Sequence, residues 1–353
     1  MRIIISVALT IGTCLAAMFV NTPASAEGPS QSRSVVVELA ENSSRIADEA
    51  SEQTGQVVSA ARKSINSEPK GGPYIHVAPK DAGVTIGAGV IAPYPSEAYT
   101  GPLTIKSPVT IENVLIDGCL RIESDDVTLR NVVITCNSYY PVKATHHANA
   151  LIEYSLVICT KPTKVFRLIS YQNFAVQHSE TRGCEDLFFL SGNNDGLDVS
   201  YNYMHSLTLI PTSHADGFQF GLVPTSGSGI IRGNYFWANA KGKKTDTIYA
   251  EGKSQVQLLI EDNFFRIWGL RTIRCGGEGS SCIIRNNIYE QAFEDMNVLP
   301  YGKLLFSYLY GKGAHEASCN RLEDGSLIKE FEGRIDRFHG VSHSVDNCPQ
   351  WPY

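Results

Sequence analysis

From about residue 72 onward, the chain alternates short hydrophobic segments with glycine, asparagine and aspartate. Segments rich in valine, isoleucine and leucine that are bounded by turn residues are typical of β-strands, and no stretch here has the period of a long amphipathic helix. One template recurs in residues 197–203, 230–235, 259–264 and 283–288, with shorter copies at 110–114 and 128–132. The pattern therefore predicts repeated turns of β-structure.

Aligning the four longer copies places like residues in three columns. The columns are Asn202, Asn234, Asn263 and Asn287; Val199, Ile231, Ile260 and Ile284; and Tyr203, Tyr235, Phe264 and Ile288. In a parallel solenoid each coil buries its apolar side chains against its neighbours, and a column of asparagines can link successive coils by side-chain hydrogen bonds. We therefore predict an all-β fold, a right-handed parallel β-helix, with the asparagines in its scaffold.

The N-terminal part has a different composition. Residues 1–26 combine Arg2, an apolar run and the small-residue site Ala24-Ser25-Ala26, which is the pattern of a cleaved signal peptide. We expect a secreted or periplasmic protein without a membrane anchor. Residues 27–70 read as a linker or a helix that caps the open end of the stack, and residues 71–353 as the β-helix domain with a C-terminal tail.

Eight cysteines follow the predicted signal peptide, an even number for a chain exported to an oxidising compartment. The absence of any Cys-x-x-Cys pair disfavours a zinc site. The cysteines of the first pair are separated by about the length of one short early coil, and the second pair follows by the same argument. The third pair closes a glycine-rich loop, and the fourth ties down the tail. The predicted disulfides are Cys119–Cys136, Cys159–Cys184, Cys275–Cys282 and Cys319–Cys348.

A second register lies upstream of the ladder asparagines at nearly constant spacing. It contains Glu185, Asp216, Asp246 and Arg271. It also places Leu187, Phe218, Ile248 and Ile273 in an inward column, and Phe188, Gln219, Tyr249 and Arg274 in an outward column. Because successive coils lie roughly 4.8 Å apart, these residues form a compact charged strip.

Two interpretations of this strip stay open. Strict alternation turns Asp216 and Asp246 inward, whereas a turn at the strand start would rotate them outward. In the scaffold interpretation the aspartates bond backbone amides as a polar ladder. In the functional interpretation, like charges on neighbouring coils are separated by a cation, a shared proton or a ligand.

Two resemblances bear on the chemistry. The string 213–219, Ser-His-Ala-Asp-Gly-Phe-Gln, resembles the Asn-Thr-Asp-Gly segment of β-helix polygalacturonases, in which the aspartate is catalytic. The order of carboxylates followed by arginines is similar to pectate lyases. That resemblance implies Glu185, Asp216 and Asp246 as calcium ligands and Arg271 or Arg274 as the base. The specific lyase strings are absent, and the resemblance is to the pectate-lyase-like superfamily as a whole.

Several neighbours complete the candidate site. His214 has a side chain that titrates near working pH and is a candidate acid or base. Lys244 lies in the adjacent loop and would meet an anionic chain, while Gln219, Tyr249 and Phe188 would contact sugar rings. Gly217 beside Asp216 would leave room for close ligand approach.

The leading functional prediction is a monomeric, exported enzyme that cleaves a uronic-acid-containing polysaccharide by β-elimination, with Ca²⁺ as candidate cofactor. The formal net charge of -6 disfavours a nucleic-acid partner. Three alternatives remain: an inverting glycoside hydrolase using Asp216 with Asp246 or Glu185, a C5-epimerase, and a non-catalytic carbohydrate-binding or surface structural protein.

Overall fold

The computed structural model describes eleven ranges of the chain, and the strands β1 to β29 lie within them. The ranges are 95–161, 164–205, 216–220, 223–238, 246–267, 271–277, 279–289, 305–309, 313–322, 325–328 and 343–348. The predicted signal peptide, the predicted linker or cap and the domain boundary near residue 70 lie outside them. No helix in the described part is long and apolar enough to cross a membrane.

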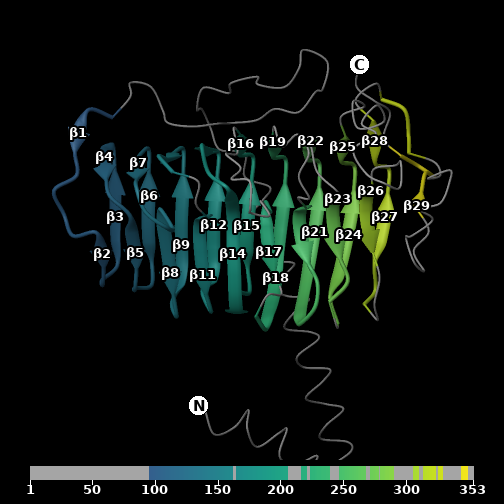
Figure 1. Cartoon of the computed structure of the whole chain (residues 1–353), viewed down its shortest axis with the longest axis horizontal. Coiled ribbons are helices and arrows are strands. Elements are labelled where there is room, and N and C mark those ends of the chain that lie inside the picture. Colours follow the sequence, from purple (N-terminus) through teal and green to yellow (C-terminus); the bar gives the residue numbers. More distant parts are fainter. Residues whose placement is uncertain are drawn as a thin grey trace, which may run out of the picture. The chain divides into compact units, whose positions relative to one another are not determined.

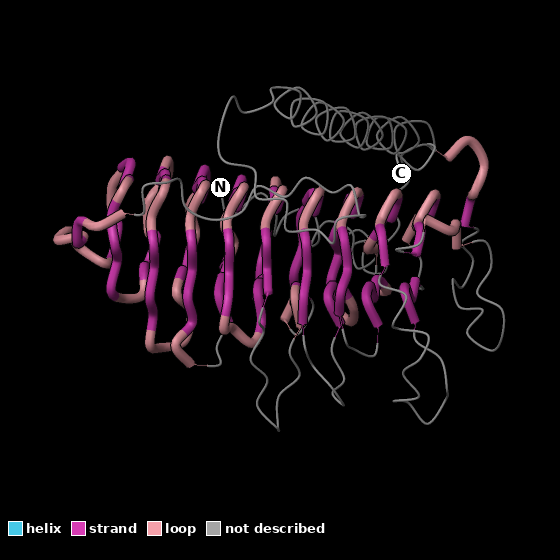
Figure 2. The backbone as a smooth tube through the Cα atoms, turned by 90° about the horizontal axis from the view of Figure 1, so that it is seen from above, coloured by secondary structure: helices cyan, strands magenta, loops and turns pink. Residues whose placement is uncertain are grey.

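The strands stack into three parallel sheets, A, B and C, and each full coil supplies one strand to each sheet in the order B, C, A (Figure 1). Figure 2 shows successive coils side by side. Sheet A consists of β1 (Glu97–Ala98), β4 (Val114–Asp117), β7 (Val133–Cys136), β10 (Leu156–Cys159), β13 (Glu180–Arg182), β16 (Tyr203–His205), β19 (Tyr235–Ala238), β22 (Phe264–Ile267), β25 (Ile288–Tyr289) and β28 (Arg321–Leu322).

The other two sheets are joined where β14 pairs with β18. Sheet B consists of β2 (Thr104–Ile105), β5 (Leu120–Ile122), β8 (Val142–Thr145), β11 (Lys164–Ile169), β14 (Asp186–Asn193), β17 (Phe218–Phe220), β20 (Asp246–Ala250), β23 (Arg271–Cys275) and β26 (Leu305–Leu309). Sheet C consists of β3 (Val109–Glu112), β6 (Val127–Arg130), β9 (Ala148–Glu153), β12 (Gln172–Gln177), β15 (Leu197–Ser200), β18 (Thr225–Arg232), β21 (Ser254–Glu261), β24 (Ser281–Arg285), β27 (Glu316–Ser318) and β29 (His343–Ser344). The predicted class, an all-β parallel β-helix, is confirmed.

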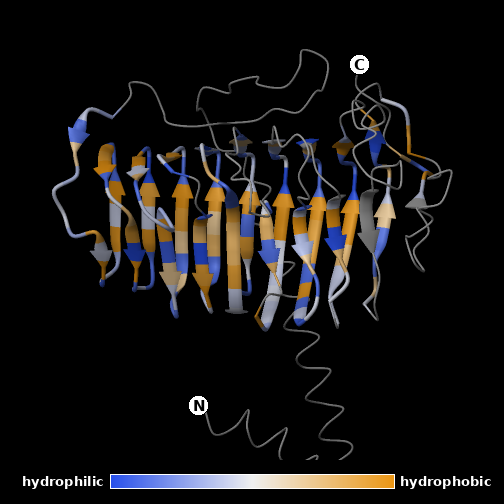
Figure 3. Cartoon of the chain, viewed as in Figure 1, coloured by the Kyte–Doolittle hydropathy of each residue, from blue (hydrophilic) through white to orange (hydrophobic). Residues whose placement is uncertain are grey.

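Hydrophobic side chains fill the inside of the coils as stacked columns, and hydrophobic and hydrophilic residues alternate along many strands (Figure 3). On sheet B, Phe166, Phe188 and Phe218 stack with ring centroids 4.7 Å apart at both steps. Ile248 and Ile273 continue this column, and all five side chains are fully buried. Burying such a side chain is worth about 1.5–3 kcal/mol, so the column is a main source of stability.

The predicted asparagine column is confirmed and extends by one residue, Asn320. The backbone N–H and Nδ2 of Asn202 both donate to Oδ1 of Asn234, at 3.0 and 2.9 Å. The same two bonds link Asn234 to Asn263, Asn263 to Asn287 and Asn287 to Asn320. Each amide is thereby satisfied inside the protein, which is the condition for burying a polar group cheaply.

The corner after sheet C uses left-handed backbone on successive coils. Asn113, Asn131, Tyr154, His178 and Tyr201 have φ between 47° and 59°, and each donates its N–H to the next coil. The His178 ring lies between the rings of Tyr154 and Tyr201, with centroids 5.2 Å from each. Stacking between like positions offsets the cost of placing residues other than glycine in this conformation.

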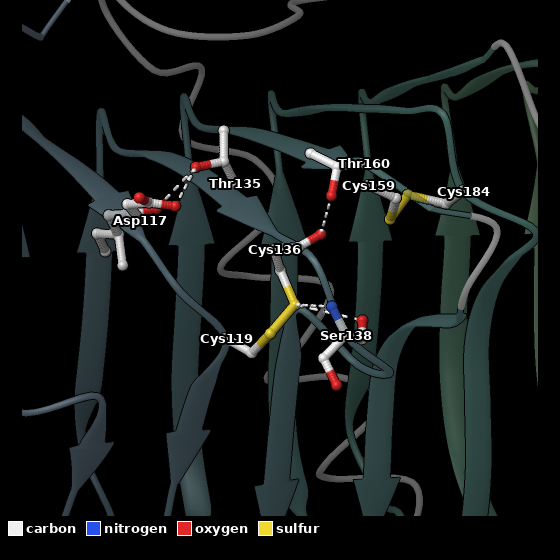
Figure 4. Close-up of a disulfide and its surroundings, with 9 residues drawn as sticks. Asp117, Cys119, Thr135, Cys136, Ser138, Cys159, Thr160 and Cys184 are labelled. Atoms are coloured by element: carbon white, nitrogen blue, oxygen red, sulfur yellow. Dashed lines mark hydrogen bonds between the residues drawn. A yellow bond between two sulfur atoms is a disulfide. The ribbon is translucent and has the colours of Figure 1, made fainter.

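All four predicted disulfides are present. They are Cys119–Cys136, Cys159–Cys184, Cys275–Cys282 and Cys319–Cys348. The first two join neighbouring coils near one corner of the helix (Figure 4), where Gly118 and Gly183 precede Cys119 and Cys184. Four disulfides indicate that the protein matures in an oxidising compartment.

Candidate functional site

The outward face of sheet B carries a row of cationic, aromatic and amide side chains, one on each coil. We call it the outward strip: Arg167, Phe189, Gln219, Tyr249 and Arg274, which are partners in the strand register. The guanidinium of Arg167 lies 4.1 Å from the centroid of the Phe189 ring, and that of Arg274 lies 5.2 Å from the centroid of the Tyr249 ring. Two cation–π pairs therefore flank Gln219.

A buried row of carboxylates lies at the start of β14 and β20 and just before the start of β17. We call it the aspartate row: Asp186, Asp216 and Asp246, with exposures of 0%, 5% and 5%. Oδ1 of Asp186 accepts the backbone N–H of Asp216 at 2.9 Å, and Oδ1 of Asp216 accepts that of Asp246 at 3.1 Å. The Oδ1 atoms of Asp186 and Asp216 therefore bond backbone amides of the next coil, as the scaffold interpretation predicts.

Cationic residues occupy the register positions at both ends of the aspartate row. Lys164, the register partner of Asp186 on the preceding coil, places Nζ 2.6 Å from Oδ2 of Asp186. The backbone of Arg271 pairs with Asp246 on the following coil, and the Arg271 side chain lies outside the described part of the structure. The row and its flanking positions therefore read Lys, Asp, Asp, Asp, Arg along five coils.

Burial dominates the electrostatics of Asp216. Desolvation raises its pKa to about 8, and the neighbouring charges of Asp246 and Asp186 add to the shift. Desolvation also raises the pKa of Asp186, while Lys164 opposes that change. Asp216 consequently keeps its proton at neutral pH, which relieves the repulsion expected between carboxylates one coil apart.

Gln219 connects the aspartate row to the outward strip. Its Nε2 donates to Oδ2 of Asp216 at 3.1 Å, and its Oε1 accepts from Nζ of Lys164 at 3.0 Å. Lys164 also lies 4.3 Å from the centroid of the Phe189 ring. A ligand that displaces Gln219 or Lys164 would therefore change the surroundings of the buried carboxylates.

A further carboxylate, Glu251, follows β20 and lies against the strip. It forms an ion pair with Arg274 and a hydrogen bond with the phenol of Tyr249. Desolvation and Glu251 raise the pKa of Tyr249, so the phenol holds its proton at neutral pH. The Glu251 side chain is 17% exposed and that of Arg274 20%, so both remain accessible to a ligand.

The register on β14 differs by one residue from the prediction. Phe188, expected to face outward, pairs with Phe218 and is fully buried, while Phe189 takes the outward position and Asp186 takes the place expected for Glu185. The N–H groups of Leu187 and Phe188 both bond to the carbonyl of Gly217. Glu185 is buried outside the row.

Other predicted members have different outcomes. A Cβ on Gly217 would lie 2.4 Å from the carbonyl oxygen of Thr247, so this glycine permits close packing of coils rather than ligand approach. Asp216 and Asp246 are turned into the protein, while Gln219, Tyr249 and Arg274 share the predicted column. His214 and Lys244 lie outside the described residues.

The donor set of the aspartate row does not fit calcium. Ca²⁺ takes six to eight oxygen ligands, whereas Oδ1 of Asp186 and of Asp216 accept amides, and their Oδ2 atoms face Lys164 and Gln219. In the described part of the chain, one group of three potential metal ligands lies within 4.8 Å of one another: Cys275, Cys282 and His315. Its two cysteines form a disulfide and are therefore not free to bind a metal.

Sequence reasoning missed Lys164, Asp186, Phe189, Arg167 and Glu251. One signal was available for Asp186: the strings Asp186-Leu187-Phe188, Asp216-Gly217-Phe218 and Asp246-Thr247-Ile248 share the pattern Asp-x-apolar. Lys164 and Arg167 precede Glu185, the first member of the predicted second register. Comparison of the chain with protein-family models, with curated proteins and with solved structures gives no match.

Proposed function

We propose that the protein binds an acidic polysaccharide on the outward strip and cleaves it by β-elimination. The observation that carries the proposal is the pairing of each strip guanidinium with an aromatic ring, beside a carboxylate and a phenol that share a hydrogen bond. Guanidinium groups suit uronate carboxylates, and aromatic rings suit the apolar faces of sugars. The parallel β-helix fold is common among carbohydrate-active proteins, which agrees with this assignment.

The proposed reaction needs three groups. A base removes the proton from the carbon next to the uronate carboxyl, a cation neutralises that carboxyl, and an acid protonates the leaving glycosidic oxygen as the carbon–oxygen bond breaks and a double bond forms. Glu251, Arg274 and Tyr249 supply these groups in that order. Arginine stays protonated at working pH, so Arg274 suits the neutralising role better than the role of base.

Calcium is not required in this scheme. Arg274 and Arg167 provide the positive charge that calcium would otherwise bring to the substrate carboxylates. We therefore expect activity to persist after treatment with a chelator, and strong dependence on added Ca²⁺ would contradict this part of the proposal. The C5-epimerase alternative shares the proton abstraction and would be recognised by a changed uronate composition without chain cleavage.

Hydrolysis is the second candidate, and the raised pKa of Asp216 favours it. A carboxyl that stays protonated at neutral pH is what a general acid needs. Asp246 on the following coil would be the second carboxylate, but strands on adjacent coils lie roughly 4.8 Å apart, which is less than the roughly 6.5–9.5 Å that an inverting pair needs. Because the Asp216 side chain is only 5% exposed, a substrate would first have to displace Gln219.

The test incubates the mature protein with polygalacturonate, polymannuronate and neutral dextran while ultraviolet absorbance and reducing ends are followed. Elimination raises both signals, hydrolysis raises reducing ends alone, and retention on a glycan without either signal indicates a binding protein. Tyr249→Phe and Glu251→Gln should each reduce elimination by at least about 100-fold. The control is Arg182→Lys on sheet A, whose guanidinium forms an exposed ion pair with Glu180; Arg274→Lys should lower turnover and Arg182→Lys should not.

A further inference from the structure

The row of outward side chains on sheet B continues beyond the strip toward the N-terminal coils. We call this continuation the basic column: Arg121, Lys143 and Arg167, one residue on each of β5, β8 and β11. Strand register makes it collinear with Phe189 and the rest of the strip. Three like charges at intervals of roughly 4.8 Å repel one another, so the arrangement favours a bound anion.

The protein itself supplies little negative charge to this column. Arg121 pairs with Glu123, but Arg167 contacts the ring and the carbonyl oxygen of Phe189, and desolvation lowers its pKa. Within the described part of the chain, the Lys143 side chain forms no ion pair or hydrogen bond. One carboxylate therefore faces three cations.

Aromatic side chains accompany the cations. Tyr139 and Tyr140 lie just before β8, with ring centroids 6.2 Å apart, and Tyr139 is 71% exposed. The phenol of Tyr140 lies close enough to Arg167 to raise its pKa, against the larger effect of desolvation. Cations next to an exposed ring are the combination expected at a surface that binds acidic sugars.

We propose that the basic column is a distal binding site for an acidic polysaccharide, so that one polymer chain lies along the helix axis over both the column and the strip. The inference rests on the substrate class of the proposed function and not on the cleavage reaction. From Arg121 to Arg274 the row spans six coil steps, or about 29 Å. The column would therefore increase affinity for polymers but not for short oligomers.

The test measures binding of polygalacturonate and polymannuronate, and of their trisaccharides, to the full mature protein at several salt concentrations. The double variant Arg121→Gln/Lys143→Gln should weaken polymer binding roughly two- to fivefold per removed charge and make the salt dependence shallower. Binding of the trisaccharides should not change, because they are far shorter than the row. Thermal unfolding of each variant verifies the fold.

The matched control, Arg130→Gln/Arg182→Gln, removes two cations from the exposed surfaces of sheets C and A. Equal weakening by both double variants would mean that only net charge matters and would overturn the proposal, as would unchanged polymer binding. The charge-retaining variant Arg121→Lys/Lys143→Arg should bind like the parent, and a large loss there would also contradict it. If the polymer binds through the column but is not cleaved, the elimination reaction is overturned and this inference stands. If the parent binds neither polymer, both are overturned.

Discussion

The buried carboxyl of Asp216 should make stability depend on pH in a direction opposite to that of a paired surface carboxylate. Burial raises its pKa from the ordinary value of 3.8 to about 8. The folded protein therefore keeps a proton that the unfolded chain releases near pH 4. The free energy of unfolding is highest below that pH and falls as the pH rises toward and through 8.

The magnitude follows from the width of this window. Each pH unit between the two pKa values is worth about 1.4 kcal/mol, so the full window is worth on the order of 5 kcal/mol, part of a typical total stability of 5–15 kcal/mol. Asp216→Asn is neutral at every pH and escapes this loss. The variant loses the hydrogen bond from Gln219, which is worth about 1 kcal/mol. The asparagine side chain has a single oxygen, and that oxygen accepts the Asp246 N–H.

The two proteins should therefore cross in stability. Below about pH 4.5 the parent should be slightly more stable than Asp216→Asn, because the parent loses the variant's deficit of about 1 kcal/mol within the first pH unit above 3.8, and at pH 9 the variant should be more stable by several kcal/mol. Urea unfolding at a series of pH values measures this difference with little effect on ionic screening. The control is Asp117→Asn on β4, an exposed aspartate (Figure 4), which should follow the parent at every pH. A constant difference between the parent and Asp216→Asn from pH 5 to pH 9 would refute the argument from burial.

Three further substitutions test the scaffold. Asn234→Ala should lower stability by about 1–3 kcal/mol and leave polysaccharide binding unchanged; loss of binding at unchanged stability would place this asparagine in the site instead. Phe188→Ala should cost about 3–5 kcal/mol in urea unfolding because it removes the middle ring of the stack, and a neutral result would contradict the register. Glu261→Gln should cost about 3–5 kcal/mol because this buried carboxylate holds Arg232 and Arg285; a change below 0.5 kcal/mol, about the size of a surface effect, would count against it.

The repeated template was sufficient to predict the parallel β-helix, its asparagine column and the first two disulfides. Stacking imposes the same residue type at the same position on each coil, so the structural requirement appears directly as a sequence repeat. The ladder at Asn202 and the pairing Cys119–Cys136 could therefore be predicted from spacing alone.

The candidate site was predicted only in part, for two physical reasons. The number of residues between the aspartate row and the ladder asparagine varies from coil to coil, so this spacing cannot distinguish Leu187 from Phe188. The direction of a side chain at the start of a strand depends on the preceding turn, so alternation could not decide whether Asp216 is buried. Its hydrogen-bond partners settle that question.

The first two disulfides also determine how the solenoid would respond to a pulling force. A stack of coils that is pulled from its ends unravels turn by turn, and each turn releases its full length of chain. Cys119–Cys136 and Cys159–Cys184 have sequence separations of 17 and 25 residues. The chain between the two cysteines of each pair cannot extend while the disulfide is intact. The N-terminal coils would therefore extend in shortened steps, and reduction would restore the missing length at about 3.3–3.6 Å per residue. A protein anchored to a long polymer would in this way resist being drawn out from the end where its chain first enters the stack.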